Sequence, residues 1–353
     1  MGWLEHYRHK LVSPEEAVCQ IDSGDLVKIP IGPQPNSLML ALAARRDELR
    51  GVQVWVDSLE YDPGWFQLGW QDSLQIVSET IIGSIARSAY SQHLVDYSPM
   101  LFCSEFKGCK SPDREGKQID ILMIVVSPPD KNGFCSFGGE LWSKRGLVSR
   151  AKKVLAQVDE EFIHTYGKNF VHVSEIDYFV NPRSPVVTED EINESISLVV
   201  DADVRKELTC LSLNMDLEDK VKYLPRLQGL SAAQIRTFGV TAGWFDSPAE
   251  VKKISSYVSE VIKDGDTIQI GYGTPSQLLV VNGVLDGKRD IGWHSELGAP
   301  GVISLIEKGL INGSKKTMNK NQAIFTGLAG ARSKELLYAC NNPKVHLLDA
   351  DHV

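Results

Sequence analysis

The stretch Asp264–Pro275, DGDTIQIGYGTP, decides the fold, because it joins an acidic turn, a short strand and a glycine-rich turn. Ser23–Pro35, SGDLVKIPIGPQP, repeats this pattern near the N-terminus. Each copy continues into an apolar helical stretch and a further strand. Alternating strands and helices form parallel sheets, and ligands bind at the carboxyl ends of the strands. The repeat predicts an α/β protein with two similar open parallel-sheet domains in tandem.

The two copies differ in how much chain follows them. After the first copy, Gln118–Val126 is a nearly continuous apolar run, which is typical of a central parallel strand. The second copy reaches the end of the sequence about where its own central strand is expected to begin. We therefore expect an N-terminal domain at residues 1–185, a linker with extra helices at 186–262 and an incomplete C-terminal domain at 263–353. An incomplete sheet exposes an unpaired edge, which a separate chain could cover.

Composition excludes several classes of partner. The chain of 353 residues has 42% hydrophobic and 24% charged residues, which is typical of a soluble globular protein. Its net charge of −9 argues against nucleic acid or an anionic membrane as the main partner. The sequence contains no apolar run of the roughly 20 residues that a membrane-spanning helix needs. Six cysteines without a C-x-x-C pair, and no visible metal-binding motif, favour a cytoplasmic protein with no metal.

A glutamate occupies the strand that follows the second glycine-rich turn. Glu296 lies within Ile291–Gly301, IGWHSELGAPG, one helix beyond the turn that contains Gly271 and Gly273. A carboxylate can attack a thioester to form an acyl-glutamyl anhydride, and the released CoA thiolate can return to form a glutamyl-CoA thioester. Such a site needs backbone N–H groups near the developing oxyanion and a loop of small residues. On the residues alone, a solvated or ion-paired glutamate remains an alternative.

Two further residues are candidates for contact with substrate. His294 lies two residues before Glu296, so both side chains are expected on the same strand face. It could bind a substrate carboxylate or simply pack in the core. Glu60 occupies the corresponding position of the first repeat and could line the substrate site or be structural. Ser127 and Ser136 lack the G-x-S-x-G context of a serine hydrolase.

Several motifs together resemble the acetyl-CoA hydrolase/transferase family, especially its 4-hydroxybutyrate and butyrate–acetate CoA-transferases. The matching segments are Asp96–Glu105, Asp120–Gly138, His164–Gly167, Asp264–Gly273 and Gly292–Glu296. The resemblance implies the fold of family I CoA-transferases and of certain sugar-phosphate isomerases. It places the glutamyl-CoA residue of the family on Glu296. It places the coenzyme loop on Gly271, Tyr272, Gly273, Thr274 and Pro275.

The resemblance also implies an activity and its substrates. We expect ping-pong transfer of CoA between an acyl-CoA and a small carboxylic acid, with acyl-CoA as substrate and no metal. An acyl-CoA hydrolase that uses the same glutamate is one alternative. A non-catalytic or half-site subunit is another, because the C-terminal segment of the family is expected to be missing from this sequence. A homodimer, or a hetero-oligomer with a chain that completes the second domain, is then expected.

Overall fold

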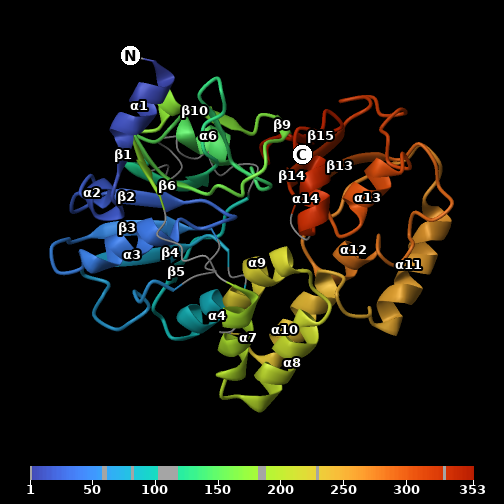
Figure 1. Ribbon diagram of the computed structural model, residues 1–353, viewed down its shortest axis with the longest axis horizontal. Helices are drawn as coiled ribbons and strands as arrows, with labels where there is room; N and C mark the ends of the chain where they lie inside the picture. The colour runs from blue at the N-terminus through green and yellow to red at the C-terminus, as the bar shows by residue number, and fades with distance from the viewer. Residues whose placement is uncertain are drawn as a thin grey trace. The chain divides into compact units, whose positions relative to one another are not determined.

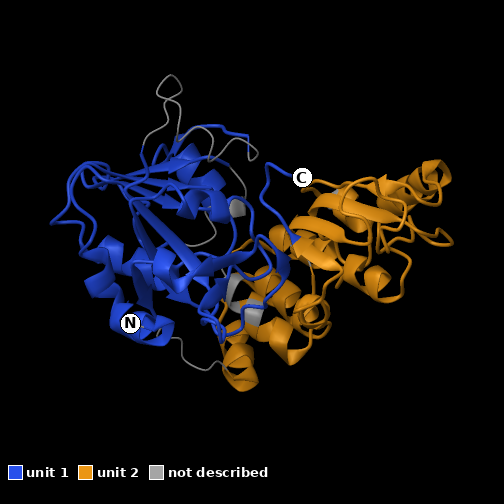
Figure 2. Ribbon diagram, turned by 90° about the horizontal axis from the view of Figure 1, so that it is seen from above, with its two compact units in different colours: residues 1–183, 347–353 blue, residues 184–346 orange. Residues whose placement is uncertain are grey.

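The computed structural model describes residues 2–57, 62–80, 83–101, 118–181, 188–227, 230–328 and 331–353. These residues form two compact units, shown in different colours in Figure 2. Unit 1 contains Met1–Arg183 and Leu347–Val353, and unit 2 contains Ser184–His346. Each unit is built around strands with parallel neighbours, so the predicted α/β class with parallel sheets is confirmed.

The described strands of the large sheet in unit 1 are all parallel to their neighbours. The strand order is β1 (Leu11–Val12), β11 (Tyr178–Val180), β8 (Lys153–Val158), β6 (Ile121–Val126), β2 (Leu26–Ile29), β3 (Val52–Val56), β4 (Leu74–Ser78) and β5 (Asp96–Tyr97). Every residue of β6 is buried, as the apolar run predicts for a central parallel strand. Strand β2 is also fully buried and lies between β6 and β3.

Helices and smaller strands complete unit 1 (Figure 1). They are α1 (Trp3–Lys10), α2 (Pro14–Val18), α3 (Asn36–Ala44), α4 (Gly83–Ser91), α6 (Lys144–Val148), the 3₁₀ helix η2 (Val173–Glu175), the antiparallel pair β7 (Phe134–Ser136) and β10 (Phe170–His172), and the short β9 (Tyr166–Gly167). Helix α3 follows the first glycine-containing turn, as the repeat predicts. Its Leu38, Met39 and Leu42 are fully buried in the core with residues of β2 and β3.

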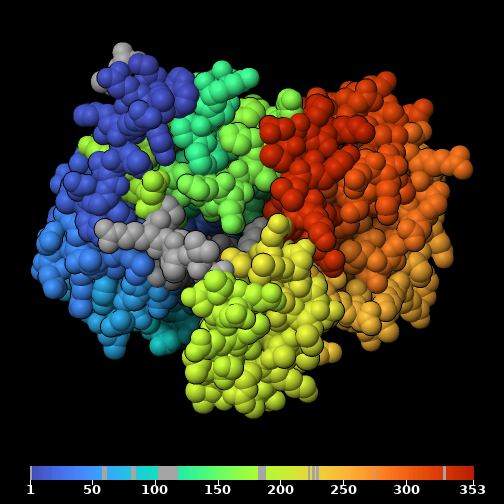
Figure 3. All heavy atoms as spheres, in the orientation of Figure 1, coloured from blue at the N-terminus to red at the C-terminus, as the bar shows by residue number. Residues whose placement is uncertain are grey.

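Unit 2 begins with a cluster of helices, α7 (Glu189–Ser197), α8 (Ala202–Ser212), α9 (Leu217–Leu227) and α10 (Ala232–Thr241). Thr188 caps α7 with the Ser/Thr-x-x-Glu pattern that the sequence contains, since its hydroxyl accepts from the N–H of Glu191. These helices have their own apolar core, which includes Ile192, Leu208 and Leu211. In Figure 3 they form a continuous yellow-green surface.

The rest of unit 2 carries the second repeat. Its elements are α11 (Ala249–Val261), β12 (Thr267–Ile268), α12 (Thr274–Leu278), β13 (Gly292–Leu297), α13 (Val302–Glu307), β14 (Ala323–Gly327), α14 (Ser333–Ala339) and β15 (Val345–Leu347). Strands β12, β13, β14 and β15 follow one another in the sheet, and β13 is parallel to both β12 and β14. By position in the repeat, β12 corresponds to β2 and β13 to β3. None of the described helices is long and apolar enough to cross a membrane.

Candidate active site

Strand β13 presents Glu296 near its carboxyl end. Trp293, Ser295 and Leu297 are fully buried, whereas His294 and Glu296 are only half-buried. Because side chains alternate along a strand, His294 and Glu296 extend from the same face, as predicted. The strand alternation therefore keeps the core side chains inside and leaves these two polar side chains partly exposed.

The glycine-rich turn lies directly beside Glu296. A Cβ atom on Gly271 would lie 3.3 Å from Oε2 of Glu296. Gly273 has φ 152°, which L-residues with a side chain rarely adopt. The Ser276 hydroxyl is within hydrogen-bond distance of the carbonyl oxygens of Gly271 (2.8 Å) and Gly273 (3.0 Å), which fixes the turn at the start of α12. The structure thus brings together the turn and the carboxylate that the sequence singled out.

The Glu296 carboxylate is partly withdrawn from water. Burial raises its pKa above the ordinary value for glutamate, because an ionised carboxylate is disfavoured where water is excluded. Within the described ranges, the carboxylate makes no hydrogen bond and no ion pair. Its lone pairs are therefore not engaged by another side chain of these ranges, which suits a nucleophile better than a structural ion pair.

Ser295 links the strand of Glu296 to the turn, and sequence reasoning missed it. The N–H of Ile270 donates to Ser295 Oγ at 3.0 Å, and the same hydroxyl donates to the carbonyl oxygen of Ile270 at 3.0 Å. The N–H of Leu297 lies 3.3 Å from this hydroxyl. The sequence did contain a signal for this role. Ser295 shares the buried face of the strand with Trp293 and Leu297, and a buried hydroxyl needs hydrogen-bond partners.

The other predicted residues differ in their surroundings. Tyr272 and Pro275 are exposed, and Thr274 is the first residue of α12, its side chain lying outside the described set. Glu60 falls at residues 58–61, which are outside the described ranges, so its predicted role stays a prediction. In the described parts of the chain, no group of three or more His, Cys, Asp or Glu side chains could hold a metal ion.

The first repeat fixes its own turn with charged side chains. The N–H of Ile31 donates to Asp57 Oδ2 at 3.0 Å, and Lys144 Nζ donates to the Ile31 carbonyl oxygen at 2.6 Å. The buried Lys28 ammonium forms ion pairs with Asp57 and Glu79. Both repeats thus hold the isoleucine that precedes the turn glycine through side chains: unit 1 uses the charged Asp57 and Lys144, whereas the contacts described in unit 2 come from the neutral Ser295.

Fold and site together define an α/β protein with a half-buried carboxylate beside a glycine-rich turn. The N-terminal domain of the acetyl-CoA hydrolase/transferase family matches residues 3–188, and the chain belongs to this family. 4-Hydroxybutyrate coenzyme A transferase of Clostridium kluyveri is 28% identical over 359 residues, which cover 100% of this chain and 68% of the relative. Succinyl-CoA:cyclohexane-1-carboxylate CoA transferase of Geobacter metallireducens is 25% identical over 354 residues, which cover 100% of this chain and 67% of that relative.

A solved structure shows the same fold. RipA from Yersinia pestis has a TM-score of 0.74 and 20% sequence identity, over 99% of this chain and 70% of RipA. The chain therefore spans roughly two-thirds of the length of each of these three proteins. The family resemblance that the motifs indicate is confirmed.

Proposed function

We propose that this chain transfers CoA between an acyl-CoA and a small carboxylic acid, with Glu296 as the nucleophile. The Glu296 carboxylate attacks the thioester carbonyl, and the C–S bond breaks to give an acyl-glutamyl anhydride and the CoA thiolate. The thiolate then attacks the glutamyl carbonyl and releases the first carboxylate, which leaves a glutamyl-CoA thioester. A second carboxylate repeats both steps in reverse order and leaves as the new acyl-CoA, so that Glu296 is regenerated.

The observation that carries this proposal is the position of Glu296. The side chain is half-buried, has a raised pKa and lies next to Gly271 at the carboxyl end of β13. A glycine at this point lets a ligand backbone approach the carboxylate, and the predicted coenzyme loop of residues 271–275 starts here. Curated relatives of this chain are CoA-transferases, which supports a thioester as the substrate class.

The test is to trap the covalent intermediate. After incubation of the chain with acetyl-CoA, borohydride should reduce the glutamyl-CoA thioester, and mass spectrometry should locate the change on the peptide that contains Glu296. Glu296→Gln should fold normally and yield no such product. Glu307→Gln, an exposed glutamate on α13, is the matched control and should react like the wild type. Normal CoA exchange by Glu296→Gln would refute the assignment.

Hydrolysis at the same glutamate is the alternative reaction, since the family name covers both activities. A transferase must keep water from the anhydride and the thioester, whereas a hydrolase admits water. Acetate-dependent CoA exchange without net release of free thiol would identify a transferase. Steady thiol release in the absence of an acceptor carboxylate would identify a hydrolase.

A half-site subunit is the second candidate, and the edge of β12, which is unpaired in the part of the chain that the structure describes, favours it. In unit 1, β2 is fully buried between β3 and β6, with Val27 paired to Ile121 in parallel register. Among the described residues, the corresponding β12 pairs with β13 only, and Thr267 is exposed. We infer that a segment outside the described residues supplies an apolar parallel strand equivalent to β6 at this edge; in a half-site subunit, that segment would belong to a partner chain.

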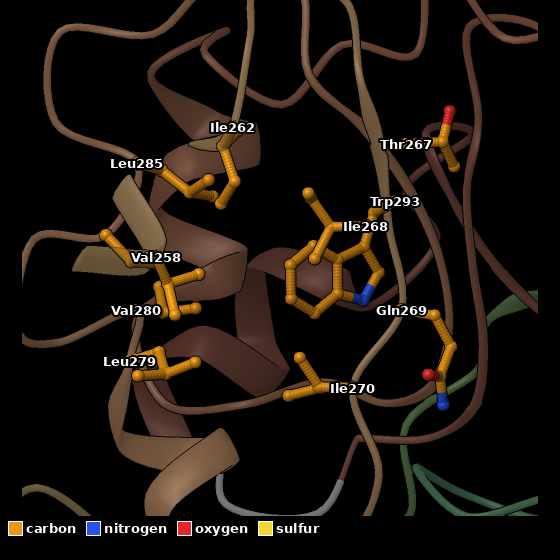
Figure 4. Close-up of a pocket in the computed structure, with 11 residues that line it drawn as sticks. Val258, Ile262, Thr267, Ile268, Gln269, Ile270, Leu279, Val280, Leu285 and Trp293 are labelled. Atoms are coloured by element: carbon orange, nitrogen blue, oxygen red, sulfur yellow. The ribbon is translucent and has the colours of Figure 1, made fainter. Parts of the chain in front are cut away.

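An apolar pocket of about 270 Å³ lies next to the same edge (Figure 4). Ile268, Ile270 and the Trp293 indole line one side of it, and Val258 and Val280 lie opposite. A parallel strand with its following helix would cover this apolar surface, as β6 does for β2. Native mass spectrometry combined with hydrogen exchange tests the idea. A free 39.1 kDa monomer whose residues 267–270 exchange rapidly would contradict a covered edge.

A further inference from the structure

The backbone pairing between β12 and β13 stops before the candidate site. The last paired residues are Ile268 and Trp293. Ile270, two residues further along, is still attached to β13, but through the Ser295 side chain and not through a backbone ladder. The two strands can therefore separate where the glycine turn begins, while one hydroxyl keeps them in a fixed relation.

The Ser295 hydroxyl uses its full hydrogen-bonding capacity in this position. A serine hydroxyl has one donor and two acceptor sites. Here it donates to the Ile270 carbonyl and accepts from the N–H groups of Ile270 and, more weakly, Leu297. The side chain is fully buried, so it does not compete with Glu296 as a nucleophile.

We propose that Ser295 is a positioning residue for Glu296, an inference that rests on the proposed nucleophilic role of Glu296. Through one oxygen atom it holds the residue that precedes Gly271 and the amide that follows Glu296. The three hydrogen bonds of the Ser295 hydroxyl thereby set the distance between the turn and the carboxylate. Without them, the two segments could move independently. Misplacement of a reacting group by about 1 Å can cost a factor of about 100 in rate.

A neutral group suits the position of Ser295, and the first repeat offers a contrast in how an isoleucine before a turn glycine is held. There, Asp57 accepts the hydrogen bond from Ile31, and the buried Lys28 balances its charge. A carboxylate in place of Ser295 would lie one residue from Glu296 and would disfavour its ionised form by repulsion between like charges. Serine fixes the backbone of Ile270 without adding charge beside the nucleophile.

The test compares Ser295→Thr with Ser295→Val in the full chain. These two side chains have the same shape, and only threonine keeps the hydroxyl. Formation of the glutamyl-CoA thioester from acetyl-CoA is measured by rapid quench and mass spectrometry across a range of acetyl-CoA concentrations. Hydrogen exchange of Ile270 and Leu297 is measured in parallel, because it reports the hydrogen bonds without requiring activity.

We expect Ser295→Thr to react within about threefold of the wild type, and Ser295→Val to lose about 10- to 100-fold in maximal rate. The acetyl-CoA concentration at half-maximal rate should stay nearly constant, because coenzyme binding does not involve the hydroxyl. In Ser295→Val the pH midpoint of thioester formation should also fall, because a loosened Glu296 is better hydrated. A purely structural defect would not shift that midpoint.

Ser295→Ala, which adds no atoms, controls for the extra methyl group of both variants. If Ser295→Ala and Ser295→Val retain the wild-type rate, or if Ile270 and Leu297 exchange as in the wild type, the positioning role is refuted. A wild-type chain that forms no thioester would instead refute the proposed function. In that case the exchange data would still decide whether Ser295 holds the two segments together.

Discussion

A Cβ atom added to Gly271 would lie 3.3 Å from Oε2 of Glu296, so the glycine turn and the candidate nucleophile are in direct contact. Any larger residue at position 271 must displace the carboxylate or the turn. The backbone of Gly271 is not in the left-handed region, so the requirement for glycine here comes from space and not from backbone conformation.

Gly271→Ala should therefore lower the rate of thioester formation by about tenfold, because the new methyl group shifts Glu296 or blocks the approach of the thioester. The free energy of unfolding should change by less than about 1 kcal/mol, since the neighbour is a half-buried side chain that can move. Single-turnover kinetics and urea unfolding provide the two values.

Gly298→Ala is the control, because it also creates a tight contact but makes it with hydrocarbon and not with the Glu296 carboxylate. Its added Cβ would lie 3.2 Å from Leu328 Cδ2, a contact of similar closeness with hydrocarbon. We expect Gly298→Ala to lose stability at least as much as Gly271→Ala while it retains thioester formation. Equal kinetic losses in both variants would show that general packing, and not contact with Glu296, is responsible.

Glu296 should also affect the pH dependence of stability. Because burial raises its pKa, the native state holds the proton more tightly than the unfolded state does. Stability is then lost as the pH rises through the raised pKa, and Glu296→Gln avoids this loss. The Tm of Glu296→Gln should equal that of the wild type near pH 4 and exceed it slightly near pH 7.

Differential scanning calorimetry across this pH range provides the comparison. The exposed Glu307→Gln should show no pH-dependent difference from the wild type. A wild-type chain that is more stable than Glu296→Gln at neutral pH would mean that the carboxylate is stabilised by a partner, contrary to the site described here.

Asp349 in unit 1 should also lower the stability of the protein as the pH rises, and by a larger free energy than Glu296 does. Burial raises its pKa to about 6, from an ordinary value near 4. Ionisation in the native state is therefore costly, and stability falls between about pH 4 and pH 6. Asp349→Asn should raise the free energy of unfolding above pH 6 by up to about 3 kcal/mol and change nothing below pH 4. The exposed Asp47→Asn serves as the control, and equal curves for the two variants would contradict the prediction.

Lys28 should be important for the stability of unit 1. It is buried with Asp57 and Glu79, and its removal would take away the ammonium that pairs with both buried carboxylates. Lys28→Met should cost about 3–5 kcal/mol in urea unfolding. The triple variant Lys28→Met, Asp57→Asn, Glu79→Gln should recover part of that loss, because it also removes the two buried negative charges.

Lys152→Met is the matched control, since Lys152 forms an ion pair with Asp120 at 2.6 Å and its side chain is 62% exposed. Exposed pairs contribute about 1 kcal/mol or less. If Lys28→Met were no more damaging than Lys152→Met, the buried ion cluster would not hold the ends of β2, β3 and β4 together.

The sequence by itself determined the α/β class, the repeat and the strand that carries Glu296. These features follow from local patterns: β6 is a continuous apolar run because helices and strands surround it, and β13 alternates because only one face is buried. The predicted proximity of Gly271 and Glu296 also follows from local rules, since parallel strands end at one edge of a sheet.

Only the tertiary structure decided which side chains hold these groups in place. Ser295 and Ile270 are 25 residues apart, and no local pattern indicates that one hydroxyl joins them. The pairing of Lys28 with Asp57 and Glu79 likewise depends on three strands that meet in space. Hydrogen bonds and ion pairs of this kind depend on distances between strands, and those distances are set by packing of the whole core rather than by the neighbours of a residue in the chain.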